Sequence, residues 1–154
     1  MLGILPVRSF APPAPRPGDR SAEAASYIRS RLGQWQQRLQ LQDWKISLEV
    51  VPVSALRPGT LGNIHWDADK QTAMIRVLSP SDYTSPFSAA VKDMEFTVVH
   101  ELIHLELSSL TRDFKNRSED SFSKEEQAVN QMAEALLQLD PGPGPEAPVV
   151  AKRK

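Results

Sequence analysis

The stretch "EFTVVHELIHLEL", residues 95–107, decides the fold, because it combines helical apolar periodicity with polar side chains that need partners. When the stretch is extended in both directions, its apolar residues form two stripes at helical spacing. One stripe holds Val91, Met94, Val98, Leu102 and Leu105, and the other holds Phe96, Val99, Ile103, Leu107 and Leu110. A helix that is apolar on two sides is typical of the centre of a domain. We therefore predict a buried central helix that begins near Ser88.

This helix carries two histidines with a glutamate directly after the first. His100 and His104 are four residues apart, so they project from one face, one turn apart. Two ring nitrogens at that spacing reach one zinc ion at about 2.0–2.1 Å. Glu101 lies about 100° around the helix, where it is placed to take a proton from a water rather than to act as an equivalent ligand. The pattern is the zinc motif HExxH; the competing interpretation is two histidines that are hydrogen-bonded inside a core helix.

A third protein ligand is expected, because catalytic zinc usually has three and one open position. The chain has no cysteine, which excludes a thiolate site and a cysteine nucleophile. His65 is an upstream candidate, and "EEQAVN" downstream offers Glu125 and Glu126. Glu126 and Asn130 are one turn apart, so Asn130 would be placed to accept from the second nitrogen of a zinc-bound histidine. Glu125 stays an alternative, because it lies nearer the centre of the apolar arc of its helix.

The other elements follow from shorter patterns. We expect a helix over 21–41 with Ser21 or Asp19 as N-cap, and a strand over 44–51. Two short strands are expected over 62–78 around a turn at Asp67–Thr72, followed by a loop over 79–87. After the central helix we expect an irregular stretch over 111–122 and a last helix over 123–139, with Ser123 as N-cap and Glu126 at the capping-box position. The order of one helix, three strands and two helices predicts an α+β fold.

Composition sets the domain boundaries and the expected partners. Proline-rich residues 1–18 and the Pro/Gly-rich, basic residues 141–154 are expected to be flexible tails around one domain, 19–140. A net charge of −1 gives no electrostatic footprint for nucleic acid. The sequence has no secretory h-region and no run that approaches about 18 apolar residues, so no membrane partner is expected. We expect a soluble, cytoplasmic monomer.

"HELIH" followed by "EQAVN" resembles the gluzincin metallopeptidases, whose glutamate helix carries Glu-x-x-x-Asp/Asn. The resemblance to thermolysin implies that Glu126 is the third zinc ligand and that Asn130 orients His100. "EQAVNQMAEALL" is also similar to the glutamate helix of the ImmA/IrrE-type peptidases.

"NIHW", 63–66, resembles the Asn-Ala-x-Trp edge strand of thermolysin-like enzymes. The resemblance implies that Asn63, Ile64, His65 and Trp66 form the strand whose main chain pairs with an extended substrate. It does not extend to a thermolysin-like C-terminal subdomain, so the transition-state histidine of those enzymes has no counterpart. Tyr83 and His65 are the local candidates for stabilising an oxyanion.

These features predict a minimal zincin-like fold: an N-terminal helix, a small three-stranded sheet, an active-site helix and a glutamate helix. The expected function is a zinc-dependent metallopeptidase that acts on a peptide or protein substrate, with Glu101 as general base. The alternative is a zinc-containing zincin-fold protein that binds or regulates peptides with little or no hydrolysis. A regulatory peptidase with a single protein target, as the ImmA/IrrE-type likeness implies, is a third interpretation.

Overall fold

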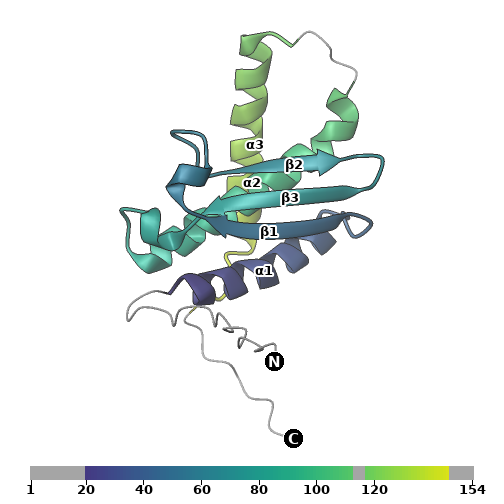
Figure 1. Ribbon diagram of the computed structural model, residues 1–154. Helices are drawn as coiled ribbons and strands as arrows, with labels where there is room; N and C mark the ends of the chain where they lie inside the picture. The colour runs from purple at the N-terminus through teal and green to yellow at the C-terminus, as the bar shows by residue number, and fades with distance from the viewer. Residues whose placement is uncertain (1–19, 113–116, 146–154) are drawn as a thin grey trace, which may run out of the picture.

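The computed structural model describes residues 20–112 and 117–145 and confirms the predicted α+β order (Figure 1). Its helices and strands are α1 (Ser21–Arg38), β1 (Lys45–Val51), β2 (Gly62–Asp67), β3 (Thr72–Leu78), α2 (Phe87–Thr111) and α3 (Glu119–Leu139). Short 3-10 turns at Val53–Ala55 and Pro80–Asp82 lie in the connections that follow β1 and β3.

The three strands form one mixed sheet in the order β1-β3-β2. β1 runs parallel to β3, and β2 runs antiparallel to it with Ile64 opposite Ile75. The predicted polar turn joins β2 to β3, where Asp67 accepts hydrogen bonds from the backbone N–H groups of Asp69 and Lys70. Because β3 is central, β2 is an edge strand of the sheet formed by the described residues.

The helices cover one face of the sheet, and Figure 1 shows α2 and α3 behind the strands. As predicted, α2 is the central helix: Met94, Val98, Val99 and Leu102 are fully buried. β2 approaches α2 closely at Gly62, where an added Cβ would lie 2.5 Å from Thr97 Cγ2 and from the carbonyl oxygen of Arg76. The missing side chain lets the edge strand start directly against α2, one turn before His100.

α1 begins at residue 21 as predicted, but Ser21 is not its N-cap, and the predicted start of α3 at residue 123 is wrong. α1 has Arg20 at its N-cap position without a side-chain cap, Ser21 is its first helical residue, and Asp19 lies outside the described residues. α3 begins at Glu119, because the side chain of Ser118 accepts a hydrogen bond from the backbone of Ser121 and acidic residues occupy the first turn. Ser123, the predicted N-cap, therefore lies inside α3.

The segment after α3 contacts α1 before the described chain ends. Arg31 donates to the carbonyl oxygen of Asp140 over 3.0 Å, and the Gly144 N–H donates to the Tyr27 hydroxyl over 3.1 Å. The predicted tail 1–18 and the rest of the C-terminal tail, 146–154, lie outside the described residues. No helix within 20–112 or 117–145 combines the length and the apolar composition that crossing a bilayer requires.

Candidate metal site

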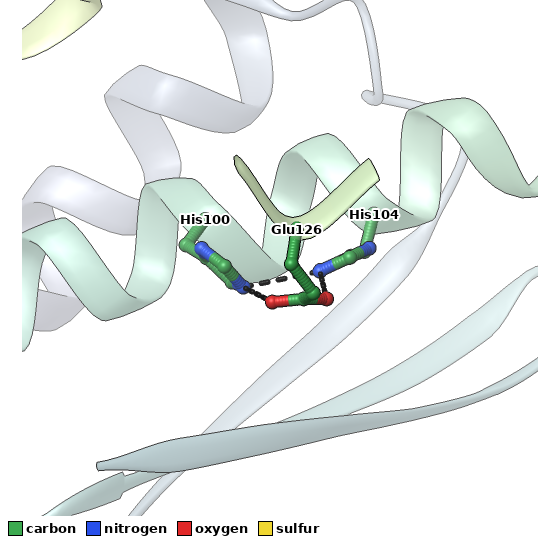
Figure 2. A group of neighbouring side chains, drawn as sticks. All are labelled: His100, His104 and Glu126. Atoms are coloured by element: carbon green, nitrogen blue, oxygen red, sulfur yellow. Dashed lines mark hydrogen bonds and ion pairs between the residues drawn. The ribbon is translucent and has the colours of Figure 1, made fainter. Parts of the chain in front are cut away.

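Two helices build the site. His100 and His104 project from one face of α2, and α3 packs against that helix through the buried side chains of Val129 and Ala133. Glu126 lies one turn before Val129, two turns inside α3, so its backbone is fixed by helical hydrogen bonds. Figure 2 shows its carboxylate between the two imidazole rings.

The donor atoms of these three residues converge. The two Nε2 atoms of His100 and His104 are 3.0 Å apart. One carboxylate oxygen of Glu126 lies 2.8 Å from Nε2 of His104, and the other lies 3.4 Å from Nε2 of His100. Among the described residues, this trio is the group of side chains that could hold a metal ion. The structure thus brings together the three ligands predicted from the sequence.

The imidazole of His100 has a partner for its other nitrogen. Oδ1 of Asn130 lies 2.9 Å from Nδ1 of His100, as the spacing of Glu126 and Asn130 predicts. With Oδ1 as acceptor, Nδ1 carries the proton and the Nε2 lone pair of His100 faces the trio. Burial and the neighbouring His104 hold the pKa of His100 below its usual range, which keeps this ring neutral at pH 7. A neutral imidazole is the form that binds a metal.

Glu101 is buried beside the trio and is not one of its members. Its side chain is 9% exposed, and burial followed by the charge of Glu126 raises the pKa of Glu101 to about 7. A carboxyl group with a pKa near neutrality is suited to accept and release a proton at physiological pH. His100 and His104 thus face Glu126, while Glu101 lies outside the trio.

Comparison of the chain with protein-family models, curated proteins and solved structures finds no match. The candidate site is therefore defined by the geometry of α2 and α3.

The remaining predicted residues lie on β2 and in the connection before α2. Ile64 packs against the core, and His65 and Trp66 are exposed near the far end of β2. His65, the upstream candidate for a third ligand, is not a member of the trio. Asn63 carries a side-chain oxygen that is buried without a hydrogen-bond partner among the described residues.

Tyr83, a predicted candidate for stabilising an oxyanion, packs its ring against the hydrophobic core. Burial, and after it the charge of Asp93, raises the pKa of Tyr83 to about 12. Its hydroxyl is buried, and the Thr97 side chain lies close enough to lower its pKa in part, but the two form no hydrogen bond of good geometry. Within 20–112 and 117–145, the converging trio does not include Tyr83, whose ring packs against the core.

Sequence reasoning missed one residue close to the site. Arg117 forms an ion pair with Glu125, and Glu125 in turn faces His104. Arg117 lies in the stretch predicted to be irregular, and its partner is eight residues away, so no helical spacing pointed to the pair. Glu125, the alternative third ligand, lies against Nδ1 of His104 rather than against the converging Nε2 atoms.

Proposed function

We propose that this protein is a zinc-dependent metallopeptidase with a minimal zincin-like fold. The observation that carries the proposal is the convergence of two imidazole nitrogens and one carboxylate, with a second, non-ligand carboxylate buried next to them. Nitrogen and oxygen donors without a thiolate suit zinc, and three protein donors leave a fourth position for water or substrate.

The spacing of the donors supports zinc in this position. Tetrahedral ligands at about 2.0–2.1 Å from zinc lie about 3.3–3.4 Å from one another. The two Nε2 atoms are 3.0 Å apart and Nε2 of His104 is 2.8 Å from Oε1 of Glu126, so these pairs need to spread by a few tenths of an ångström. One donor atom from each of the three residues lies within 4.8 Å of the other two. Within the proposal, His100, His104 and Glu126 hold the ion, and Asn130 fixes the ring of His100.

Zinc and Glu101 have separate roles in the proposed hydrolysis. When bound, zinc supplies Lewis-acid polarisation of a water and of the scissile carbonyl. Glu101 accepts a proton from the attacking water and gives it to the nitrogen of the leaving amine, so the C–N bond breaks without a covalent enzyme intermediate. The raised pKa of Glu101 suits both transfers.

The edge strand β2 supports a peptide as substrate. Residues Asn63–Trp66 belong to a strand that pairs with β3 on one side and leaves its other side open within the described sheet. An extended peptide can add to such an edge through main-chain hydrogen bonds. The proposal therefore takes an extended peptide or an unfolded segment of a protein as substrate, and a cytoplasmic monomer that needs neither nucleic acid nor membrane.

The test combines metal analysis with cleavage. The purified full chain is expected to hold one zinc per molecule and to cleave peptides in a broad library, and chelation is expected to abolish cleavage. Glu101→Gln keeps the shape of the side chain and removes the base, so turnover is expected to fall about 10²–10⁴-fold. Zinc content of this variant should match the wild type, because the ligands are untouched.

Two outcomes would overturn the proposal in different ways. A wild-type chain that holds zinc and binds peptides without cleaving any of them would favour the peptide-binding alternative. A wild-type chain that binds no zinc would remove the metal from the function altogether.

A further inference from the structure

His104 has a neighbour that the proposed chemistry does not use. Its Nδ1 atom lies 3.5 Å from Oε1 of Glu125, while its Nε2 atom faces Glu126. Consecutive residues of α3 thus approach the two sides of one imidazole ring. His100 has the same arrangement, with Glu126 near Nε2 and Asn130 at Nδ1.

The carboxylate of Glu125 is itself held in place. Its second oxygen forms an ion pair with Arg117, which directly precedes the N-cap of α3. The side chains of Glu125 and Arg117 are only 16% and 28% exposed. Asp120 and Lys124 form an ion pair on the same helix, but both are more than 70% exposed. Solvent-exposed pairs of that kind contribute little, whereas partly buried, charge-assisted contacts fix geometry.

We propose that Glu125, held by Arg117, is a positioning residue that orients His104 for metal binding. With zinc on the Nε2 side of His104, the ring proton would be on Nδ1, and a carboxylate beside Nδ1 would accept it and fix the ring. Glu125 and Asn130 then do the same for the two histidines, one from each side of Glu126. The inference rests on the proposed zinc site for its consequence, but the contact itself exists in the metal-free protein.

The first readout is the tautomer of His104 in the metal-free full chain. The chain has three histidines, so nitrogen chemical shifts of ¹⁵N-histidine-labelled protein at about pH 8, where imidazoles are neutral, report each ring separately. In the metal-free wild type, two carboxylates compete for the proton of His104: Glu126 lies 2.8 Å from Nε2, and Glu125 lies 3.5 Å from Nδ1. In Glu125→Ala, the Nδ1–H tautomer of His104 is expected to lose population, while His65 and His100 keep their shifts.

The second readout is zinc affinity by competition with a chelator. Loss of a partner of this type typically lowers metal affinity about 10–100-fold, so that loss is expected for Glu125→Ala. Glu125→Gln keeps a carbonyl acceptor for Nδ1 and should recover part of the affinity. Asp120→Asn is the matched control, since it removes a carboxylate from an ion pair on the same helix, and its affinity should equal that of the wild type.

Each result decides between named alternatives. Wild-type affinity together with an unchanged His104 tautomer in Glu125→Ala would overturn the inference. Complete loss of zinc in Glu125→Ala with retention in Glu126→Ala would make Glu125 a ligand instead. If the wild type binds no zinc, the proposed function fails, and the tautomer in the metal-free protein still decides the role of Glu125. If Glu125→Ala does not fold, Arg117→Met tests the same contact and should lower affinity less.

Discussion

Helix α2 takes part in two groups of polar side chains, one buried and one partly buried, and the two groups differ in how their hydrogen-bonding atoms are satisfied. Glu95 accepts hydrogen bonds from Arg31 at 2.6 Å, Trp35 at 2.7 Å and Tyr27 at 3.4 Å. We call these four residues the Glu95 cluster. About one and a half turns later, His100 and His104 face Glu126, and we call these three residues the His cluster.

The two clusters show how a structural polar group differs from a candidate site. In the Glu95 cluster, every charge is matched: the carboxylate has three donors, and Arg31 also reaches Gln34 and Asp140. In the His cluster, the Nε2 atoms of His100 and His104, which are both able to bind a metal, lie 3.0 Å from each other, and the carboxylate of Glu126 lies beside both. A cation at their meeting point would satisfy all three at once, whereas one proton satisfies only one pair.

The largest expected effect comes from breaking the Glu95 cluster. Glu95→Ala leaves the Arg31 charge buried without its main partner, which typically costs about 3–5 kcal/mol in the free energy of unfolding. Urea denaturation measures this loss, and zinc affinity under native conditions should not change. Glu23→Ala, which removes a carboxylate paired with Arg20 at the surface, is the control and should cost far less than Glu95→Ala. A loss below about 1 kcal/mol for Glu95→Ala would contradict the structural role.

The next effect concerns the pH dependence of stability in the metal-free protein. The pKa of Glu101 rises from 4.5 to about 7 on folding, so between those values the unfolded chain releases the proton while the folded chain keeps it. Stability therefore falls as pH rises through this window, by about 3 kcal/mol in total. Glu101→Gln lacks this fall.

Unfolding free energies of the chelated wild type and of Glu101→Gln, measured from about pH 4 to about pH 8, check the sign. As pH rises, the unfolding free energy of Glu101→Gln should increase relative to that of the wild type. A constant difference between the two proteins across the window would show that Glu101 ionises as readily in the folded chain as in the unfolded one.

A smaller effect is expected from the partner of His100. Asn130→Ala removes the acceptor at Nδ1 and should lower zinc affinity about 10–100-fold, which is about 1.4–2.7 kcal/mol. Gln131→Ala, the neighbouring exposed amide, is the matched control. Chelator competition measures both variants. Equal affinities in the two would mean that the Asn130 contact does not orient the ring.

The smallest effect is expected from a polar group that belongs to neither cluster. Tyr83→Phe removes a buried hydroxyl that forms no hydrogen bond of good geometry, its polar neighbour being Thr97, so stability should change by less than about 1 kcal/mol. Turnover should stay within a few-fold of the wild type. A loss of about 10²–10³-fold, the typical effect of deleting an oxyanion donor, would assign Tyr83 to catalysis after all.

Local patterns were sufficient to predict the elements and the residues at the centre of the site. The spacing of His100 and His104 depends only on helix geometry, and the alternation in residues 44–51 only on strand geometry. The choice between Glu125 and Glu126 depended on how α3 is rotated against α2. That rotation is set by the packing of Val129 and Ala133 against α2, and it cannot be predicted from the sequence of α3 alone.

Long-range contacts account for the rest of what the sequence did not predict. The parallel pairing of β1 with β3 joins strands that are separated by β2 along the chain. The partners of Glu95 are 60 or more residues away in α1. The N-cap of α3, Ser118, was not predicted, because Ser123 offers a similar capping pattern five residues later. The local sequence does not decide between the two serines.

The way α3 is attached to the domain has a consequence for folding. Of its 21 residues, only Val129 and Ala133 are buried, and Leu136 and Leu137 pack against the core in part, so the apolar contacts of this helix are few and lie in its second half. An ion held jointly by His104 and Glu126 would bind only the state in which α3 is docked on α2. Its binding free energy would therefore stabilise the docked state relative to states in which α3 is detached. Ion uptake and docking of α3 would then be one coupled equilibrium. The supply of metal would set how much of the protein has its last helix in place.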